Sequence, residues 1–230
     1  MQVKDLKKLM FKPGLDYTHT NESLDAIIAG LDIKQGDLIL AVGGSGDQAF
    51  AMLEYAKSLL IVVDKNKHQI DYIAKRIELM KKGFYNKSLK IGELGIQDGI
   101  CRGTRNYELM KFNIEKRNKY FLQKGRLDRI RENLGYVSLV NADIFSVLGW
   151  GNQKLYLSNA SLSLDYEWFE HIQQYKLIYS ASRALDIYRC KTKDKTPHLS
   201  KDFSLTAKAS DLQKNKWELW EPAVYRPVKS

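Results

Sequence analysis

Cysteine and histidine are scarce in this sequence of 230 residues. Its two cysteines, Cys101 and Cys190, lie far apart, and its four histidines form no H-E-x-x-H or similar cluster. A metal site needs several such ligands at short, defined spacings, so we expect no bound metal. The isolated cysteines favour free thiols in a reducing compartment over a disulfide framework.

Long apolar runs are missing as well. No run approaches the roughly 18 residues of a transmembrane helix, and the first 14 residues lack the apolar stretch of a signal peptide. Apolar residues make up 44% of the chain and charged residues 28%, which is ordinary for a globular protein. We therefore expect a cytoplasmic protein that folds as a single domain over residues 1–230.

The most informative stretch runs from residue 37 to residue 66. An apolar run ends there in a glycine turn made of Gly43, Gly44, Ser45 and Gly46, and helix-forming residues and a second apolar run follow. Glycines allow positive φ angles and let a ligand approach the backbone, and the helix N-terminus beyond them favours negative charge. The second run ends in Asp64, about twenty residues after the turn, where an acid suits the ribose hydroxyls of a nucleoside.

The glycine turn departs from two common nucleotide motifs. Its spacing is G-x-x-G instead of the G-x-G-x-x-G of dinucleotide folds, and the P-loop pattern G-x-x-x-x-G-K-[ST] does not occur. A loose glycine turn with one acid resembles the class I S-adenosylmethionine (SAM) transferases, which bind no pyrophosphate. That resemblance implies an α/β fold with a doubly wound, mostly parallel, Rossmann-like sheet, and SAM as the cofactor.

Further strand signals follow along the chain, at residues 136–140, 154–159 and 176–182. Beyond them the sequence changes to strand-like runs at 184–190 and 223–228, which predict an antiparallel edge at the C-terminal end of the sheet. The polar stretch between these runs, residues 191–216, is expected to be a loop. A short basic helix is expected over residues 3–11.

Residues 84–135 differ from the rest of the chain, because they lack a clear strand and show amphipathic patterns. They predict two or three helices, which we interpret as an insertion over the carboxyl edge of the sheet, where α/β folds bind their ligands.

The net charge of +10 is concentrated in this insertion and the tail. Residues 102–131 hold ten basic and three acidic residues, and residues 189–230 hold ten and five. Such placement predicts an anionic partner, either an anionic membrane surface or, less favoured, nucleic acid. A solvated, solubilising face explains the charge equally well.

Polar residues follow several predicted strands, and the carboxyl ends of parallel strands meet in one crevice. We expect Asp64 to bind the ribose, Asp143 the adenine amino group, and Asn159 the amino acid end of SAM or the substrate. Local roles are alternatives, because Asp143 can cap a helix and Asn159 can form a turn. The complete predicted cofactor set is Tyr17, Gly43, Gly44, Ser45, Gly46, Asp64, Lys65, Asn66, Gln69, Ala142, Asp143, Ile144 and Asn159.

A more specific resemblance involves three segments. Asp64-x-Asn66-x-x-Gln69 resembles the D-x-N-x-x-Q segment of the diacylglycerol 3-amino-3-carboxypropyltransferases of betaine-lipid synthesis. Residues 15–22 resemble their Y-T-Q-x-W-E-D stretch, with Asn21 in place of the tryptophan, and residues 156–159 resemble their strand ending in S-N. The resemblance implies transfer of the 3-amino-3-carboxypropyl group of SAM to a hydroxyl such as that of diacylglycerol, by a protein peripheral to the membrane.

An acceptor can attack either the sulfonium methyl of SAM or its methionine-derived Cγ. Both carbons are already activated by the sulfonium, so the protein mainly positions the acceptor and removes its proton. Candidate bases are Glu22, Tyr17 and His19, and Glu22 and Tyr17 are the predicted catalytic residues. Glu22 can instead cap the helix that begins near Ser23, and Tyr17 can be a lid or core residue. Two alternative functions stay open, which are a methyltransferase, for example for RNA, and a SAM-binding module without catalysis.

Overall fold

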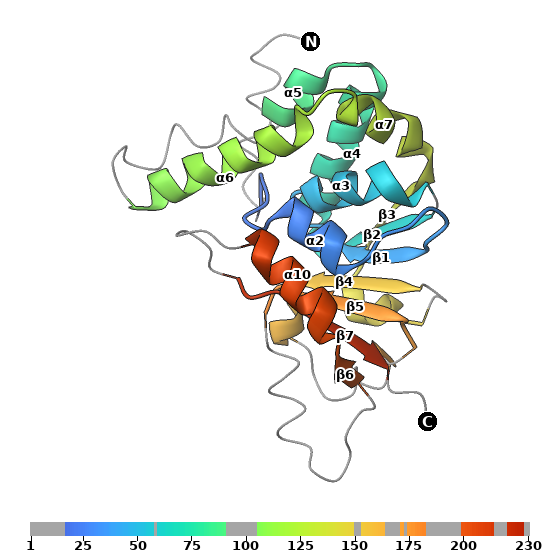
Figure 1. The fold of residues 1–230 in the computed structure, drawn as a ribbon. Helices are drawn as coiled ribbons and strands as arrows, with labels where there is room; N and C mark the ends of the chain where they lie inside the picture. The colour runs from blue at the N-terminus through green and yellow to red at the C-terminus, as the bar shows by residue number, and fades with distance from the viewer. Residues whose placement is uncertain are drawn as a thin grey trace.

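A computed structural model describes residues 17–57, 59–90, 105–149, 153–163, 171–172, 174–182, 199–213 and 220–227. These residues form one seven-stranded sheet in the order β3-β2-β1-β4-β5-β7-β6 (Figure 1). The strands are β1 (Ile39–Val42), β2 (Leu60–Asp64), β3 (Val137–Asn141), β4 (Lys154–Ser158), β5 (Leu177–Ser180), β6 (Leu199–Lys201) and β7 (Ala223–Pro227).

Strands β1 to β5 pair in parallel, and β7 runs antiparallel to both β5 and β6. A reversed strand β7 between β5 and β6 is the arrangement of the class I SAM-transferase fold. The sheet therefore confirms the predicted fold class, including the antiparallel C-terminal edge.

Seven α-helices and three 3₁₀-helices are described. The α-helices are α2 (Leu24–Gly30), α3 (Asp47–Ala56), α4 (Lys67–Lys81), α5 (Tyr85–Lys90), α6 (Arg105–Phe121), α7 (Arg126–Asn133) and α10 (Phe203–Gln213). The 3₁₀-helices are η2 (Leu134–Tyr136), η3 (Ile144–Val147) and η4 (Ala160–Ser163).

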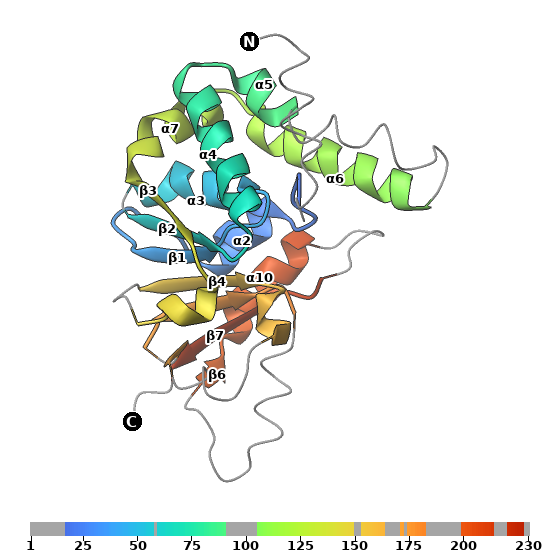
Figure 2. The ribbon, with the colours of Figure 1, turned by 180° about the vertical axis from the view of Figure 1, so that it is seen from behind.

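The sheet is buried on both faces, which explains why its central strands are continuous apolar runs. Successive residues of a strand point to opposite faces, so Ile39 and Ala41 of β1 join one core cluster and Leu40 joins the other. The first cluster packs under α2, α3, α4, α7 and α10, and the second under η3 and the segment around Ile172. Figures 1 and 2 show these two sides.

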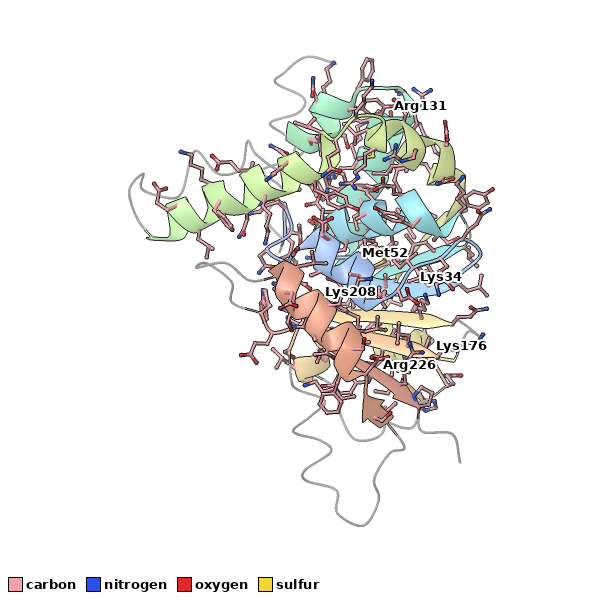
Figure 3. The ribbon with its side chains drawn as sticks, viewed as in Figure 1. Lys34, Met52, Arg131, Lys176, Lys208 and Arg226 are labelled. Carbon is pink, nitrogen blue, oxygen red and sulfur yellow. The ribbon has the colours of Figure 1, made fainter. Side chains whose placement is uncertain are left out.

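The segment 84–135 forms α5, α6 and α7, in agreement with the predicted helices. Helix α7 packs on α3 and α5 packs on α4. Helix α6 projects from the body on the side where the chain around residue 20 lies (Figures 1 and 2). Arg131 on α7 is exposed and lies at the outside of the molecule (Figure 3).

The predicted loop at 191–216 is wrong where the structure describes it. Strand β6 and helix α10 occupy this stretch, and β6 pairs with β7. Helix α10 has many serine and threonine residues and a weak apolar stripe, so its sequence lacks a clear helical signal. The predicted helix at 3–11 and strand at 184–190 lie outside the described residues.

Gly30 allows α2 to approach the sheet and α10 closely. A Cβ atom on Gly30 would lie 2.7 Å from the ring of Tyr179 and 3.3 Å from Cβ of Ala209. Tyr179 is almost fully buried, so its ring has no space to move away. The position therefore demands glycine because of packing.

We expect Gly30→Ala to lower the free energy of unfolding by about 1–3 kcal/mol, because it overpacks this contact. For a chain of this size that is a fall in Tm of roughly 2–4 °C for each kcal/mol. Gly135→Ala is the matched control, because a Cβ at Gly135 meets nothing within 4 Å. Thermal melts that show equal Tm values for the two variants would contradict the proposed packing.

Candidate active site

Two adjoining cavities lie at the carboxyl edge of the sheet. The larger has a volume of about 680 Å³ and the smaller about 30 Å³. Both are lined by Tyr17, Val42 and Asn159, so these residues mark their junction. The larger cavity is also lined by Val63, Asp64, Lys65, Asp143, Ile144, Phe145, Ala160 and Leu162. The smaller is also lined by His19, Thr20, Asn21, Gly44, Ser45, Gln48, Tyr156 and Ser158.

The glycine turn between β1 and α3 is held tightly against its neighbours. The Gly43 N–H donates to the Val63 carbonyl at 2.8 Å, and a Cβ on Gly43 would lie 3.0 Å from Cβ of Asp64. Gly44 and Gly46 have φ angles of +48° and +82°, which favour glycine. A Cβ on Gly46 would also lie 3.0 Å from Ile73 of α4. Gly44 and Ser45 therefore face the smaller cavity, while Gly43 and Gly46 support the turn.

Asp64 stands at the end of β2 and lines the larger cavity. Its Oδ2 accepts a hydrogen bond from the Gly44 N–H at 3.1 Å, and its Oδ1 accepts one from the Asn66 N–H at 2.8 Å. These two bonds orient the carboxylate at the end of β2. Asn66 itself caps α4, because its side chain accepts from the His68 N–H at 3.0 Å.

The residues after β3 form the floor of the larger cavity. Asp143 caps η3, accepting from the Phe145 N–H at 3.0 Å, and it lines the cavity at the same time. Ile144 and Phe145 add apolar surface. The Ala142 N–H donates to the Asp64 carbonyl at 3.1 Å, so it belongs to the sheet and is not offered to a ligand.

Residues 17–23, which we call the strap, cross the carboxyl edge and close the smaller cavity. Helix α4 holds the beginning of the strap through its side chains. Gln69 accepts from the Tyr17 N–H at 3.2 Å and donates to the Tyr17 carbonyl at 2.6 Å, and Tyr72 donates to the Thr18 carbonyl at 2.8 Å. Burial raises the pKa of Tyr72 to about 12, so its hydroxyl stays protonated and keeps donating. Gln69, predicted to bind the cofactor, is thus buried behind Tyr17, which is 42% exposed at the cavities.

The rest of the strap is bound by other elements. Asp47 of α3 accepts from the Thr20 N–H at 2.9 Å, and Gln48 donates to the Thr20 hydroxyl at 3.0 Å. The Ser23 N–H donates to Gln213 of α10 at 3.1 Å. Since α3, α4 and α10 all contribute, the strap is a fixed wall of the site.

A buried ion pair lies beneath the strap and the glycine turn. Arg76 of α4 donates to Asp47 Oδ1 at 2.7 Å and to the Ser45 carbonyl at 2.7 Å. Both charged side chains are fully buried, with 0% exposure. Burial alone would raise the pKa of Asp47, but the charges of Arg76 and Arg117 outweigh burial and hold that pKa below its ordinary value. The sequence analysis missed this pair, which is separated by 29 positions.

Glu22, the predicted base, lies behind the cavity wall. It is 1% exposed and lines neither cavity. Its carboxylate accepts hydrogen bonds from the Tyr156 hydroxyl at 2.8 Å and from the Ser158 hydroxyl. Those two residues and His19 do line the smaller cavity. A catalytic role for Glu22 stays a prediction.

The predicted site residues therefore divide into two groups. The residues that line a cavity are Tyr17, Gly44, Ser45, Asp64, Lys65, Asp143, Ile144 and Asn159. Gly43, Gly46, Asn66, Gln69 and Ala142 support these from behind. The lining residues Phe145, Leu162, Gln48 and Tyr156 were not predicted, whereas Ser158 belongs to a strand end that was expected at this edge. Gln48 closely follows the glycine turn in the chain, whereas the strand order brings the other residues to the cavities.

We expect Asp47→Asn to lower the free energy of unfolding by about 3–5 kcal/mol, because it leaves Arg76 buried without its counter-charge. The lowered pKa of Asp47 means that its contribution is complete above its ordinary pKa of 3.8 and is lost as the pH falls through the lowered value. The wild type should therefore lose stability in acid more steeply than Asp47→Asn. Denaturant unfolding at several pH values measures both effects.

The control is Asp71→Asn, which breaks the exposed pair between Lys67 and Asp71 on α4. Such a pair is worth at most about 1 kcal/mol. If Asp47→Asn were no more harmful than Asp71→Asn, the buried pair would not stabilise the fold.

Comparison with known proteins adds distant structural neighbours. No protein-family model matches the chain, and no curated protein matches it. A solved rRNA methylase from Streptococcus thermophilus is similar at 8% identity, with 89% of this chain and 95% of that chain covered and a TM-score of 0.42. The rRNA methyltransferase aviRa from Streptomyces viridochromogenes is similar at 13% identity, with 98% and 92% covered and a TM-score of 0.40. These values carry no argument about activity, and the resemblance to the betaine-lipid transferases finds no support among them.

Proposed function

We propose that this protein is a SAM-dependent transferase, with transfer of the methyl group to a polar acceptor as its reaction. The observation that carries the proposal is the half-buried carboxylate of Asp64, oriented by the glycine turn at the mouth of the larger cavity. A single acid at the end of the second strand suits the two hydroxyls of a ribose.

The larger cavity fits the adenosine part of SAM. Val63, Ile144, Phe145 and Leu162 supply apolar surface for a flat base, and Asp143 in the same lining is the proposed acceptor for its amino group. A volume of about 680 Å³ is within the usual range for small-molecule sites. When bound, SAM supplies a carbon that is already activated by the sulfonium.

We assign the amino acid end of SAM to the polar lining of the smaller cavity. Its lining is rich in hydroxyl, amide and backbone groups, with Ser45 of the glycine turn on one side and Thr20 of the strap on the other. Asn159 lies where the two cavities join. The chain's own contribution is therefore to bind, orient and enclose the reactants, which is the main requirement for displacement at an activated carbon.

A polar acceptor is favoured over diacylglycerol by the surroundings of this junction. Acyl chains need an extended apolar surface, whereas the described residues at the amino acid end are mainly polar, with His19, Thr20 and Asn21 among them. Transfer of the 3-amino-3-carboxypropyl group remains the alternative. No described helix is long and apolar enough to cross a membrane.

The basic segment gives only weak support for an anionic partner. Arg117 and Arg126 are buried, and Arg126 and Arg129 both pair with Glu54 of α3. Several of its charges thus hold α6 and α7 to the body. Exposed cations such as Lys124 and Arg131 remain for a nucleic acid, which is the acceptor class we favour over a lipid.

We expect Asp64→Ala to lower SAM affinity at least about tenfold, because hydrogen bonds to a charged group are worth roughly 1.5–3 kcal/mol. Isothermal titration calorimetry measures the effect. Asp71→Ala removes the same charge from an exposed position on α4 and should bind SAM like the wild type. Equal affinity of a folded Asp64→Ala variant and the wild type would refute the SAM site.

The nucleoside product distinguishes the possible functions. We expect S-adenosylhomocysteine to accumulate when the protein is incubated with SAM and a cell extract, since methyl transfer leaves that product. Methylthioadenosine, detected by mass spectrometry, would instead establish 3-amino-3-carboxypropyl transfer. If the protein binds SAM but forms no more of either product than the Asp64→Ala control does, it is a binding module.

A further inference from the structure

Ser158, the last residue of β4, has an unusual backbone conformation. Its φ angle is +52°, in the left-handed region that residues with a side chain seldom adopt. The pairing of β4 with β5 shifts its register between Tyr156 and Ser158. The Ser158 carbonyl still accepts from the Ala181 N–H at 2.9 Å. Such conformations persist only where the surroundings hold them, and they cluster at functional sites.

Glu22 holds Ser158 from the strap. One oxygen of its carboxylate, Oε1, accepts from both the Ser158 hydroxyl and the Tyr156 hydroxyl, the latter at 2.8 Å. Burial and then the negative charge of Glu22 raise the pKa of Tyr156 well above its ordinary value, so this hydroxyl stays a donor. The carboxylate therefore fastens the end of β4 to the strap at two points.

Asn159 follows Ser158 directly in the chain. It lines both cavities. Its side-chain amide makes no hydrogen bond with any residue that the structure describes. A carboxamide offers both donors and an acceptor, so Asn159 presents a polar group at the junction that no described residue binds.

We propose that Glu22 is a positioning residue that acts through Ser158 to direct the Asn159 carboxamide to the junction of the two cavities, where it contacts the methionine end of SAM. The inference rests on the proposed function. In this role Glu22 acts through its oxygen Oε1 as a hydrogen-bond acceptor and does not need to take up a proton. Glutamine keeps an acceptor oxygen at the same place, whereas alanine removes it.

The first test is a double-mutant cycle on SAM affinity by calorimetry. We expect Glu22→Ala and Asn159→Ala each to weaken SAM binding about tenfold, the loss of one hydrogen bond to a charged ligand. The double variant should also lose about tenfold, because Glu22 acts through Asn159, whereas independent effects would multiply to about a hundredfold. Glu22→Gln should stay within about threefold of the wild type.

The second test measures the NMR chemical shift of the Asn159 side-chain amide in the absence of ligand. Its side-chain amide signal in a ¹⁵N NMR spectrum, assigned with Asn159→Asp, should move in Glu22→Ala and stay near its place in Glu22→Gln. Glu54→Ala is the matched control, because Glu54 is another buried glutamate but pairs with Arg126 and Arg129 away from the cavities. It should leave the Asn159 signal unchanged. Ser158→Ala removes the hydrogen bond between Ser158 and Glu22. It is used in place of Glu22→Ala if Glu22→Ala does not fold.

The outcomes separate the two proposals. Wild-type protein that binds no SAM would refute the proposed function, and the NMR comparison would still decide the role of Glu22. An unmoved Asn159 signal and wild-type SAM affinity in Glu22→Ala would overturn the positioning role. A hundredfold loss in the double variant would overturn the path through Asn159.

Discussion

The buried ion pair between Asp47 and Arg76 is the interaction on which the site depends. Two charges with no exposure are costly to place in a core unless they are paired, and here each bonds to a part of the site as well as to its partner. Arg76 binds the carbonyl of Ser45 in the glycine turn, and Asp47 binds the N–H of Thr20 in the strap. The Asp47–Arg76 ion pair and its hydrogen bonds thus hold helices α3 and α4, the glycine turn and the strap together.

A consequence is that side chains of several elements hold the strap in place at the site. The strap is bonded to α3, α4, β4 and α10 by side chains, so little backbone ordering remains to be done on binding. Affinity benefits when such ordering has already taken place. Within the strap, Glu22 binds the protein interior and lines neither cavity, whereas Tyr17 and Thr20 line the cavities.

The sequence predicted the local pattern better than the contacts between distant residues. The strand, glycine turn, helix and Asp64 are consecutive in the chain, so spacing alone revealed them. Gln69 was assigned to the cofactor because of its motif, but its amide binds the backbone of Tyr17, which is 52 positions away. The pair of Asp47 and Arg76 gave no pattern to find, and α10 lacks a strong apolar stripe. Such features become visible only when the strand order brings separate elements together.

The position of β7 has a consequence for how the chain acquires its fold. It is the last described strand in sequence, yet it lies between β5 and β6 and hydrogen-bonds to both. Among the described strands, β6 pairs only with β7, so β6 is synthesised before its partner, and the edge of β5 stays open until β7 is made. Helix α10, which connects β6 to β7, packs on α2 and binds the strap through Gln213. Pairing of β7 with the sheet and attachment of the strap to α10 thus both depend on residues 199–227.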